Sequence, residues 1–168
     1  MDSTTQDTTP HDTAPLDALF EARSIAIVGA SENVTRMGGG LTMRFLIDHG
    51  YQGDLYPVNP KRDEVQGIAC HASLESVPGP IDLAVLAVPA AAIPGVLEAI
   101  PAGHVRMALV MTSGFGELSD EGVEIERRTL ETARARGVRF VGPNSVGVAN
   151  MWGPMVNSFS QIFDAKGL

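Results

Sequence analysis

Cysteine, basic residues and long apolar runs are all scarce in this chain. Cys70 is the only cysteine, so no disulfide can form within the chain, and secretion gains no support. The 12 lysines and arginines are outnumbered by 20 aspartates and glutamates, which argues against unaided binding to nucleic acid or anionic lipid. The uncharged, apolar stretch at residues 83–97 is too short to span a bilayer. We therefore expect a cytoplasmic protein whose partner is a small molecule, with no nucleic acid and no membrane involved.

The length and composition favour a single globular domain. The chain has 168 residues, of which 44% are hydrophobic and 19% charged. Residues 1–14 lack the basic start and apolar run of a signal peptide, and their polar composition predicts a disordered tail. The folded domain is expected to begin at residue 15.

Apolar runs alternate with amphipathic stretches along the rest of the chain. Helices are expected at residues 41–49, 91–100 and 119–136, and strands at residues 24–28, 54–58, 81–88, 105–111 and 138–141. Two of the runs, "IDLAVLAV" and "VRMALVMT", do not alternate, which is typical of strands covered on both faces. The pattern predicts an α/β fold, a doubly wound Rossmann-like parallel sheet of about five strands, in the order 3-2-1-4-5. A ligand is then expected beyond the carboxyl ends of the strands.

The first strand leads into a glycine-rich turn, "VGASENVTRMGGG". Glycines at positions 29 and 38 allow phosphate oxygens to approach backbone N–H groups, and the following helix adds partial positive charge. The hydroxyl of Ser31 can also donate. The spacing does not match the dinucleotide fingerprint GxGxxG, so an ordinary turn remains the alternative to a phosphate site.

The second strand ends in "YPVNPKR", where a domain that binds NAD would carry an acidic residue for the ribose hydroxyls. Asn59, Pro60, Lys61 and Arg62 stand there instead, and the two cations suit a phosphate on the ribose. NADP and coenzyme A both carry such a phosphate, whereas NAD does not. A solvated turn is the alternative reading of these residues.

The remaining strand ends add an apolar wall and a polar rim. Val88 and Pro89 follow the third strand, "TSGFGE" the fourth and "GPNS" the last. Phe115 is expected to offer an aromatic face, and the amide of Asn144 could orient a ligand. Each segment alone is compatible with an ordinary turn, but all of them fall on the same edge of the sheet.

Candidates for catalysis are missing from the sequence. None of the histidines, at positions 11, 49, 71 and 104, has a convincing nucleophile or acid partner, and no cluster has metal-ligand spacing. An enzyme of hydride transfer would also need a substrate-binding half, for which the chain is too short. We therefore predict no catalytic residue and no metal site.

Five motifs in order resemble the CoA-binding domain of the NDP-forming acyl-CoA synthetases, relatives of the succinyl-CoA synthetase α subunit. They are "SIAIVGAS", "GYQGDLYPVNPKRDEVQGI", "SLESVPGPIDLAVLAVPA", "SGFGE" and "GPNSVG". The resemblance runs from about Ser24 to Asn157. It implies a Rossmann-like domain, residues 15–157, that binds CoA.

The resemblance also implies roles for individual residues. Gly29, Ala30 and Ser31 correspond to the phosphate turn, and Lys61 to the contact with a CoA phosphate. Residues 58–60 and 88–89 form walls around the nucleotide and pantetheine, and residues 113–115 and Asn144 the rim toward the thiol. The cofactor-binding residues so expected are Gly29, Ala30, Ser31, Arg36, Gly38, Val58, Asn59, Pro60, Lys61, Val88, Pro89, Ser113, Gly114, Phe115 and Asn144.

The family joins a carboxylic acid to CoA at the expense of ATP or GTP, through an acyl phosphate and a phosphohistidine. In the family that histidine lies in a following flavodoxin-like domain, and an ATP-grasp domain binds the nucleotide. Neither is found in this sequence, so residues 158–168 are expected to begin a linker to a missing domain, and the chain to be incomplete for catalysis. The family commonly has cysteine where Ser145 stands here, so no role for a thiol carries over.

Three other functions stay open at this point. A stand-alone, non-catalytic CoA-binding module shares the first half of the pattern but usually lacks "GPN" at the last strand. A fragment of an NADP-binding oxidoreductase is supported only by Lys61 and Arg62. A protein acetyltransferase fused to a synthetase-like region is compatible with the same residues.

Overall fold

The computed structural model describes residues 16–164. The predicted tail, residues 1–14, lies outside the described residues, and so does the end of the expected linker. The described part of the linker, from residue 158, contains a short 3₁₀ helix, η3 (Gln161–Asp164).

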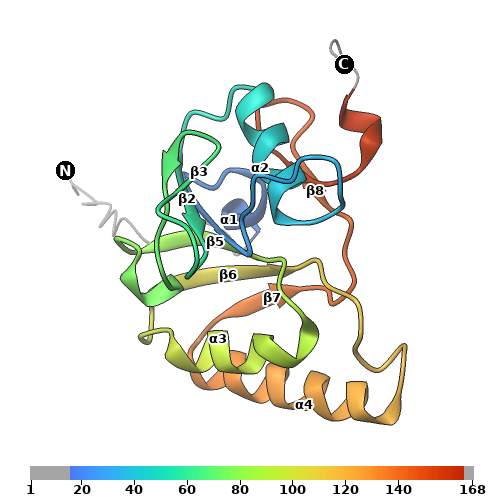
Figure 1. Ribbon diagram of the computed structural model, residues 1–168. Coiled ribbons are helices and arrows are strands. Elements are labelled where there is room, and N and C mark those ends of the chain that lie inside the picture. Colours follow the sequence, from blue (N-terminus) through green and yellow to red (C-terminus); the bar gives the residue numbers. More distant parts are fainter. Residues whose placement is uncertain (1–15, 165–168) are drawn as a thin grey trace, which may run out of the picture.

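Five parallel strands form the central sheet (Figure 1). In the order in which they lie side by side, they are β2 (Asp54–Val58), β1 (Ser24–Val28), β5 (Ile81–Leu86), β6 (Val105–Val110) and β7 (Arg139–Val141). Every neighbouring pair is parallel, so the five carboxyl ends lie at one edge of the sheet. The predicted single α/β domain with a Rossmann-like parallel sheet is confirmed.

The predicted order of the strands is wrong. Numbered along the chain, the five strands lie in the order 2-1-3-4-5, because β5 pairs with β1 on the side away from β2. Apolar runs identify strands but do not say in which direction the chain crosses from one strand to the next. The direction reverses after β2, and this places the topological switch point between the ends of β1 and β5.

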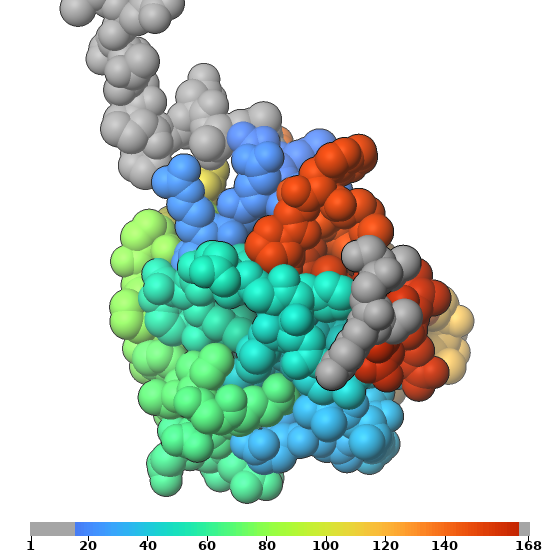
Figure 2. Space-filling model, turned by 90° about the horizontal axis from the view of Figure 1, so that it is seen from above, coloured from blue at the N-terminus to red at the C-terminus, as the bar shows by residue number. Residues whose placement is uncertain are grey.

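Helices cover both faces of the sheet (Figure 1). One face carries η2 (Ala90–Ala92), α3 (Ile93–Ala99) and α4 (Asp120–Ala135), and the other α1 (Asp17–Phe20), α2 (Gly39–Asp48) and the hairpin of β8 (Gly147–Ala149) and β9 (Val156–Ser158). In Figure 2, the hairpin (red-orange) lies against the blue residues around α1, where the Asn150 side chain donates a hydrogen bond to the Phe20 carbonyl.

Two cores form because side chains alternate between the faces of each strand. Ala26, Val28 and Leu86 pack toward α3 and α4, whereas Ile25, Ile27 and Val85 pack toward α1 and α2. All five residues of β1 are buried. Burial on both faces explains why the central runs show no polar alternation in the sequence.

The connection from β2 to β5 contains no long helix. It holds a two-stranded ribbon, β3 (Glu64–Val65) and β4 (Ile68–Ala69), followed by a 3₁₀ turn, η1 (Leu74–Ser76). These short elements stand beside the carboxyl edge, where His71 bridges to Val58 at the end of β2. They therefore supply one wall of the region in which the sequence places a ligand.

Candidate functional site

Two glycines, one in the turn after β1 and one at the start of α2, leave no room for a Cβ. Gly29 has φ +89°, and a Cβ added to it would lie 2.5 Å from the carbonyl oxygen of Ala87. A Cβ added to Gly39 would lie 2.5 Å from the carbonyl oxygen of Gly29. The ends of β1 and β5 and the first turn of α2 therefore meet in backbone contact.

A small cavity of about 230 Å³ opens at this meeting point. Its lining is polar and rich in glycine, and includes Gly29, Ser31, Asn33, Arg36, Gly38, Gly39, Gly40 and Ala87. The Asn33 side chain accepts hydrogen bonds from the backbone N–H groups of Thr35 and Arg36, at 3.0 and 3.2 Å, and so shapes the loop. Because the first N–H groups of a helix lack partners within it, this cavity suits an anion.

A second cavity, of about 700 Å³, adjoins the first at Gly29, which lines both. Its walls come from the ends of β1, β2 and β5, from η1 and from α3. Val28, Val58, Leu74, Val88, Pro89 and Val96 make it largely apolar, and Lys61 lies at its border. A planar apolar group next to a negative charge fits such a space.

Asn59 ties the two strand ends together. Its Nδ2 donates to the carbonyl oxygen of Ala30 at 2.8 Å, and its Oδ1 accepts from the backbone N–H of Lys61 at 3.0 Å. Both polar atoms of the amide are therefore engaged, and the side chain holds the glycine turn beside the Lys61 loop.

Gln66 supports the same turn and was missed by sequence reasoning. Its Nε2 donates to the carbonyl oxygens of Ser31 and Gly40, at 3.0 and 2.8 Å. Its backbone, with φ +51°, forms the turn of the β3–β4 ribbon together with Gly67. The only signal in the sequence is the dipeptide "QG", which indicates a turn but not its destination.

Hydrogen bonds link the remaining strand ends into a rim. Thr112 donates from Oγ1 to the Val88 carbonyl at 2.7 Å, and the Asn144 N–H donates to the Thr112 carbonyl at 2.9 Å. Ser113 and Asn144 are exposed at this rim. The structure brings the predicted segments 88–89, 113–114 and 144 to the same edge, although Ser113, Gly114 and Asn144 border neither cavity.

The expectation that Phe115 presents an aromatic face is wrong. Its side chain is 1% exposed and packs in the core between the sheet, α3 and α4. The Glu117 carboxylate receives the backbone N–H groups of Gly114 and Phe115, at 2.7 and 3.1 Å. These bonds hold the pKa of Glu117 below its usual value, and the bond from the Gly114 N–H makes the largest contribution. The loop is thus shaped by a carboxylate and anchored by an aromatic ring.

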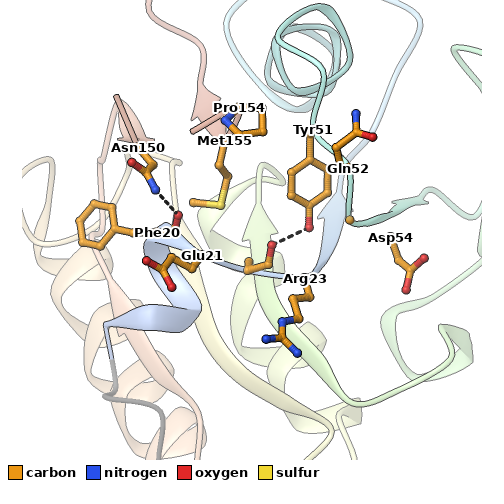
Figure 3. Close-up of a pocket in the computed structure, with 11 residues that line it drawn as sticks. Phe20, Glu21, Arg23, Tyr51, Gln52, Asp54, Asn150, Pro154 and Met155 are labelled. Carbon is orange, nitrogen blue, oxygen red and sulfur yellow. Dashed lines mark hydrogen bonds between the residues drawn. The ribbon is translucent and has the colours of Figure 1, made fainter. Parts of the chain in front are cut away.

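A third cavity, of about 620 Å³, lies at the opposite, amino edge of the sheet and contains none of the predicted site residues (Figure 3). Tyr51 points across it and donates to the Ala22 carbonyl at 2.9 Å, while Asn150 reaches Phe20 from the β8–β9 turn. Burial, with the charges of Asp82 and Asp54, raises the pKa of Tyr51. This cavity is separate from the glycine turn after β1.

His49 and His71 have ordinary surroundings, whereas the buried Nε2 of His104 has no hydrogen-bond partner. The Nε2 of His49 lies 2.9 Å from the Phe163 carbonyl, and His71 packs edge-on against Tyr56. Over residues 16–164 no group of three His, Cys, Asp or Glu side chains is placed to hold a metal ion. Burial raises the pKa of the Cys70 thiol. None of the helices in the described range is long and apolar enough to cross a membrane.

The chain matches part of several much longer proteins. The α subunit of ADP-forming acetate–CoA ligase I from Pyrococcus furiosus is 40% identical over 137 residues, which are 79% of this chain and 29% of that subunit. ADP-forming acetate–CoA ligase II from Archaeoglobus fulgidus is 37% identical over 142 residues, or 84% of this chain and 21% of that protein. The chain thus spans less than a third of these relatives.

A solved structure shows the same fold. The acetyl-coenzyme A synthetase 1 of Ca. Korarchaeum cryptofilum, in complex with phosphate and ADP, matches with a TM-score of 0.79 and 34% identity, over 86% of this chain and 30% of that one. The family model described as CoA binding domain matches residues 23–151. This range includes the glycine turn after β1 and the Lys61 loop after β2. The chain therefore belongs to the CoA-binding domain family and is similar to this part of the NDP-forming acyl-CoA synthetases.

Proposed function

We propose that this chain is the CoA-binding domain of an NDP-forming acyl-CoA synthetase. The full enzyme would convert a carboxylic acid, CoA and a nucleoside triphosphate to acyl-CoA, nucleoside diphosphate and phosphate. The observation that carries the proposal is the pair of adjoining cavities, one lined by glycines at the start of α2 and one apolar with Lys61 at its border. Partner domains with the phosphohistidine and the ATP-grasp fold would supply the chemistry.

The two cavities suit different parts of CoA. The diphosphate fits the small cavity, where Gly29, Ser31, Arg36 and Gly38 offer N–H groups, a hydroxyl and a cation. The adenosine fits the large cavity, with its ribose phosphate at Lys61. Pantetheine would then leave past Val88 and Pro89 toward the rim at Ser113 and Asn144, where the thiol meets the partner domains. The domain binds and orients CoA, and its own residues transfer no proton.

Calorimetric titration of the purified chain tests this proposal. CoA should bind saturably, 3′-dephospho-CoA more weakly, and NAD not at all. Binding of NADP in place of CoA would overturn the proposal in favour of an oxidoreductase fragment. If CoA binds, an open reading frame that continues into a histidine-bearing domain separates the synthetase from a stand-alone CoA-binding module.

A further inference from the structure

The loop at residues 31–37 supplies a hydroxyl and a cation to the lining of the small cavity. These groups belong to Ser31 and Arg36. The Asn33 side chain bonds only within the loop, to Thr35 and to the backbone N–H of Arg36, and most of the loop is exposed. The internal bonds shape the loop, but they do not fix its position on the domain.

Gln66 provides the attachment of this loop to the rest of the domain. In the part of the chain that the structure describes, every hydrogen bond to the loop from a segment distant in sequence comes from Gln66. Its Nε2 donates to the Ser31 carbonyl oxygen at 3.0 Å, and its backbone N–H donates to Glu32 Oε1 at 2.8 Å. The same Nε2 donates to the carbonyl oxygen of Gly40 at 2.8 Å. One side chain thus joins the loop to the first turn of α2.

The backbone of Gln66 indicates that this residue serves its side-chain contacts rather than its own turn. Gln66 and Gly67 form the two-residue turn of the β3–β4 ribbon, with φ +51° and +79°. Glycine, asparagine and aspartate are the usual residues at the first position of such a turn, because few others adopt a positive φ readily. Glutamine brings a longer side chain, which reaches Ser31 and Gly40. Uncommon backbone that is held by such contacts is typical of functional sites.

We propose, resting on the CoA-binding function above, that Gln66 is a positioning residue for the CoA diphosphate. It borders neither cavity of the site and acts through the loop, which it holds with Ser31 and Arg36 in place before the ligand arrives. A loop that is already ordered loses less conformational entropy when the ligand binds. The bond to Glu32 also engages the loop's own carboxylate, whose charge would otherwise repel the diphosphate.

The test is a double-mutant cycle, measured by calorimetry with CoA. Gln66→Met keeps the length of the side chain but donates no hydrogen bond, and it should weaken CoA binding about 10-fold. Arg36→Ala should weaken binding about 10-fold in the unaltered chain but only about 2-fold in the Gln66→Met background, because a loop that is no longer held presents Arg36 poorly. Lys61→Ala should cost the same in both backgrounds, since Lys61 lies on a different loop.

Gln66→Gly separates this role from a contribution to the fold. Glycine adopts a positive φ freely, so this variant lacks the side-chain donor but relieves the backbone. It should weaken CoA binding as much as Gln66→Met does, while its thermal unfolding midpoint stays at or above that of Gln66→Met. Gln52→Ala removes an exposed amide that bonds only to the Gly50 carbonyl, and it should leave CoA binding unchanged.

The outcomes distinguish the two proposals. Unchanged CoA affinity in Gln66→Met and Gln66→Gly would overturn the role of Gln66 and leave CoA binding established. Equal losses from Arg36→Ala in the two backgrounds would do the same, because Gln66 would then not act through the loop. Failure of the unaltered chain to bind CoA would overturn the proposed function itself. Thermal unfolding of each variant without ligand shows that it is folded.

Discussion

The side chain of Asn59 donates a 2.8 Å hydrogen bond to the carbonyl oxygen of Ala30. This bond joins the loop after β2 to the turn after β1, the two segments that the proposed function assigns to the ribose phosphate and the diphosphate. The Asn59 amide, which bonds to both segments, thus fixes the Lys61 loop relative to the glycine turn.

Replacing Asn59 by alanine should therefore affect both stability and binding. Loss of a part-buried hydrogen bond is expected to lower the free energy of unfolding by about 1 kcal/mol, measured by urea denaturation, and to weaken CoA binding as well. Gln52→Ala is the matched control, because that exposed amide bonds only to the nearby Gly50 carbonyl. Equal losses of stability in the two variants would show that the hydrogen bond from Asn59 to Ala30 contributes no more than an exposed local one.

Reversing the charge at Lys61 should weaken CoA binding. A hydrogen bond between charged groups contributes about 1.5–3 kcal/mol, and Lys61→Glu should lose that amount in calorimetry with CoA but much less with 3′-dephospho-CoA. Arg62→Glu makes the same change in net charge at the adjacent exposed residue, which does not line the cavity. Unchanged affinity in Lys61→Glu would remove Lys61 from the site.

Two glycines on the site's helices should respond to alanine in opposite ways. A Cβ at Gly39 would lie 2.5 Å from the Gly29 carbonyl oxygen and 3.2 Å from the Ala30 nitrogen, all rigid backbone, so Gly39→Ala should destabilise the fold by about 1–3 kcal/mol. Gly95 lies in α3 with open space around it, and Gly95→Ala should stabilise the fold by about 0.5–1 kcal/mol. Thermal unfolding of both variants measures the contrast, and a stable Gly39→Ala would mean that the turn can open.

The strands and the edge that carries the site were predictable because local chemistry determines them. Two apolar runs without alternation predicted strands buried on both faces, and β5 and β6 are such strands. A helix was predicted at residues 119–136, and α4 begins there with the Ser119 hydroxyl accepting the N–H of Gly122 as an N-cap. Each of these signals lies within a few residues of the feature that it predicts.

The features that sequence reasoning missed depend on contacts between distant segments. The strand order follows from the direction of a crossover, which no local pattern records. Gln66 reaches Ser31 and Gly40 across a ribbon that has no counterpart in the predicted elements. Phe115 stands in a glycine-rich loop typical of an exposed rim, yet its ring fills the space between the sheet and α4. Packing, rather than composition, decided its place.

The loop that begins at Ser113 should lose order in acid. Hydrogen bonds from the backbone N–H groups of Gly114 and Phe115 lower the pKa of Glu117, so the ionised carboxylate is favoured by the folded loop. A lowered pKa means that this stabilisation is present above about pH 4.3, the usual value for glutamate, and disappears as the pH falls through the lower value of the folded state. Hydrogen exchange of the Gly114 and Phe115 amides, followed by NMR against pH, measures the effect.

Glu117→Gln should abolish this pH dependence, because at every pH the neutral amide keeps one acceptor oxygen and replaces the other with an NH2 group that cannot accept an N–H. Exchange at both amides should then be faster at neutral pH than in the unaltered chain and should change little on acidification beyond the intrinsic rate. Glu98→Gln removes an exposed carboxylate from α3 and should leave the original profile in place. If the Gly114 amide stays protected from exchange well below the lowered pKa, the buried ring of Phe115 holds the loop by itself. The Glu117 carboxylate then contributes nothing to its order.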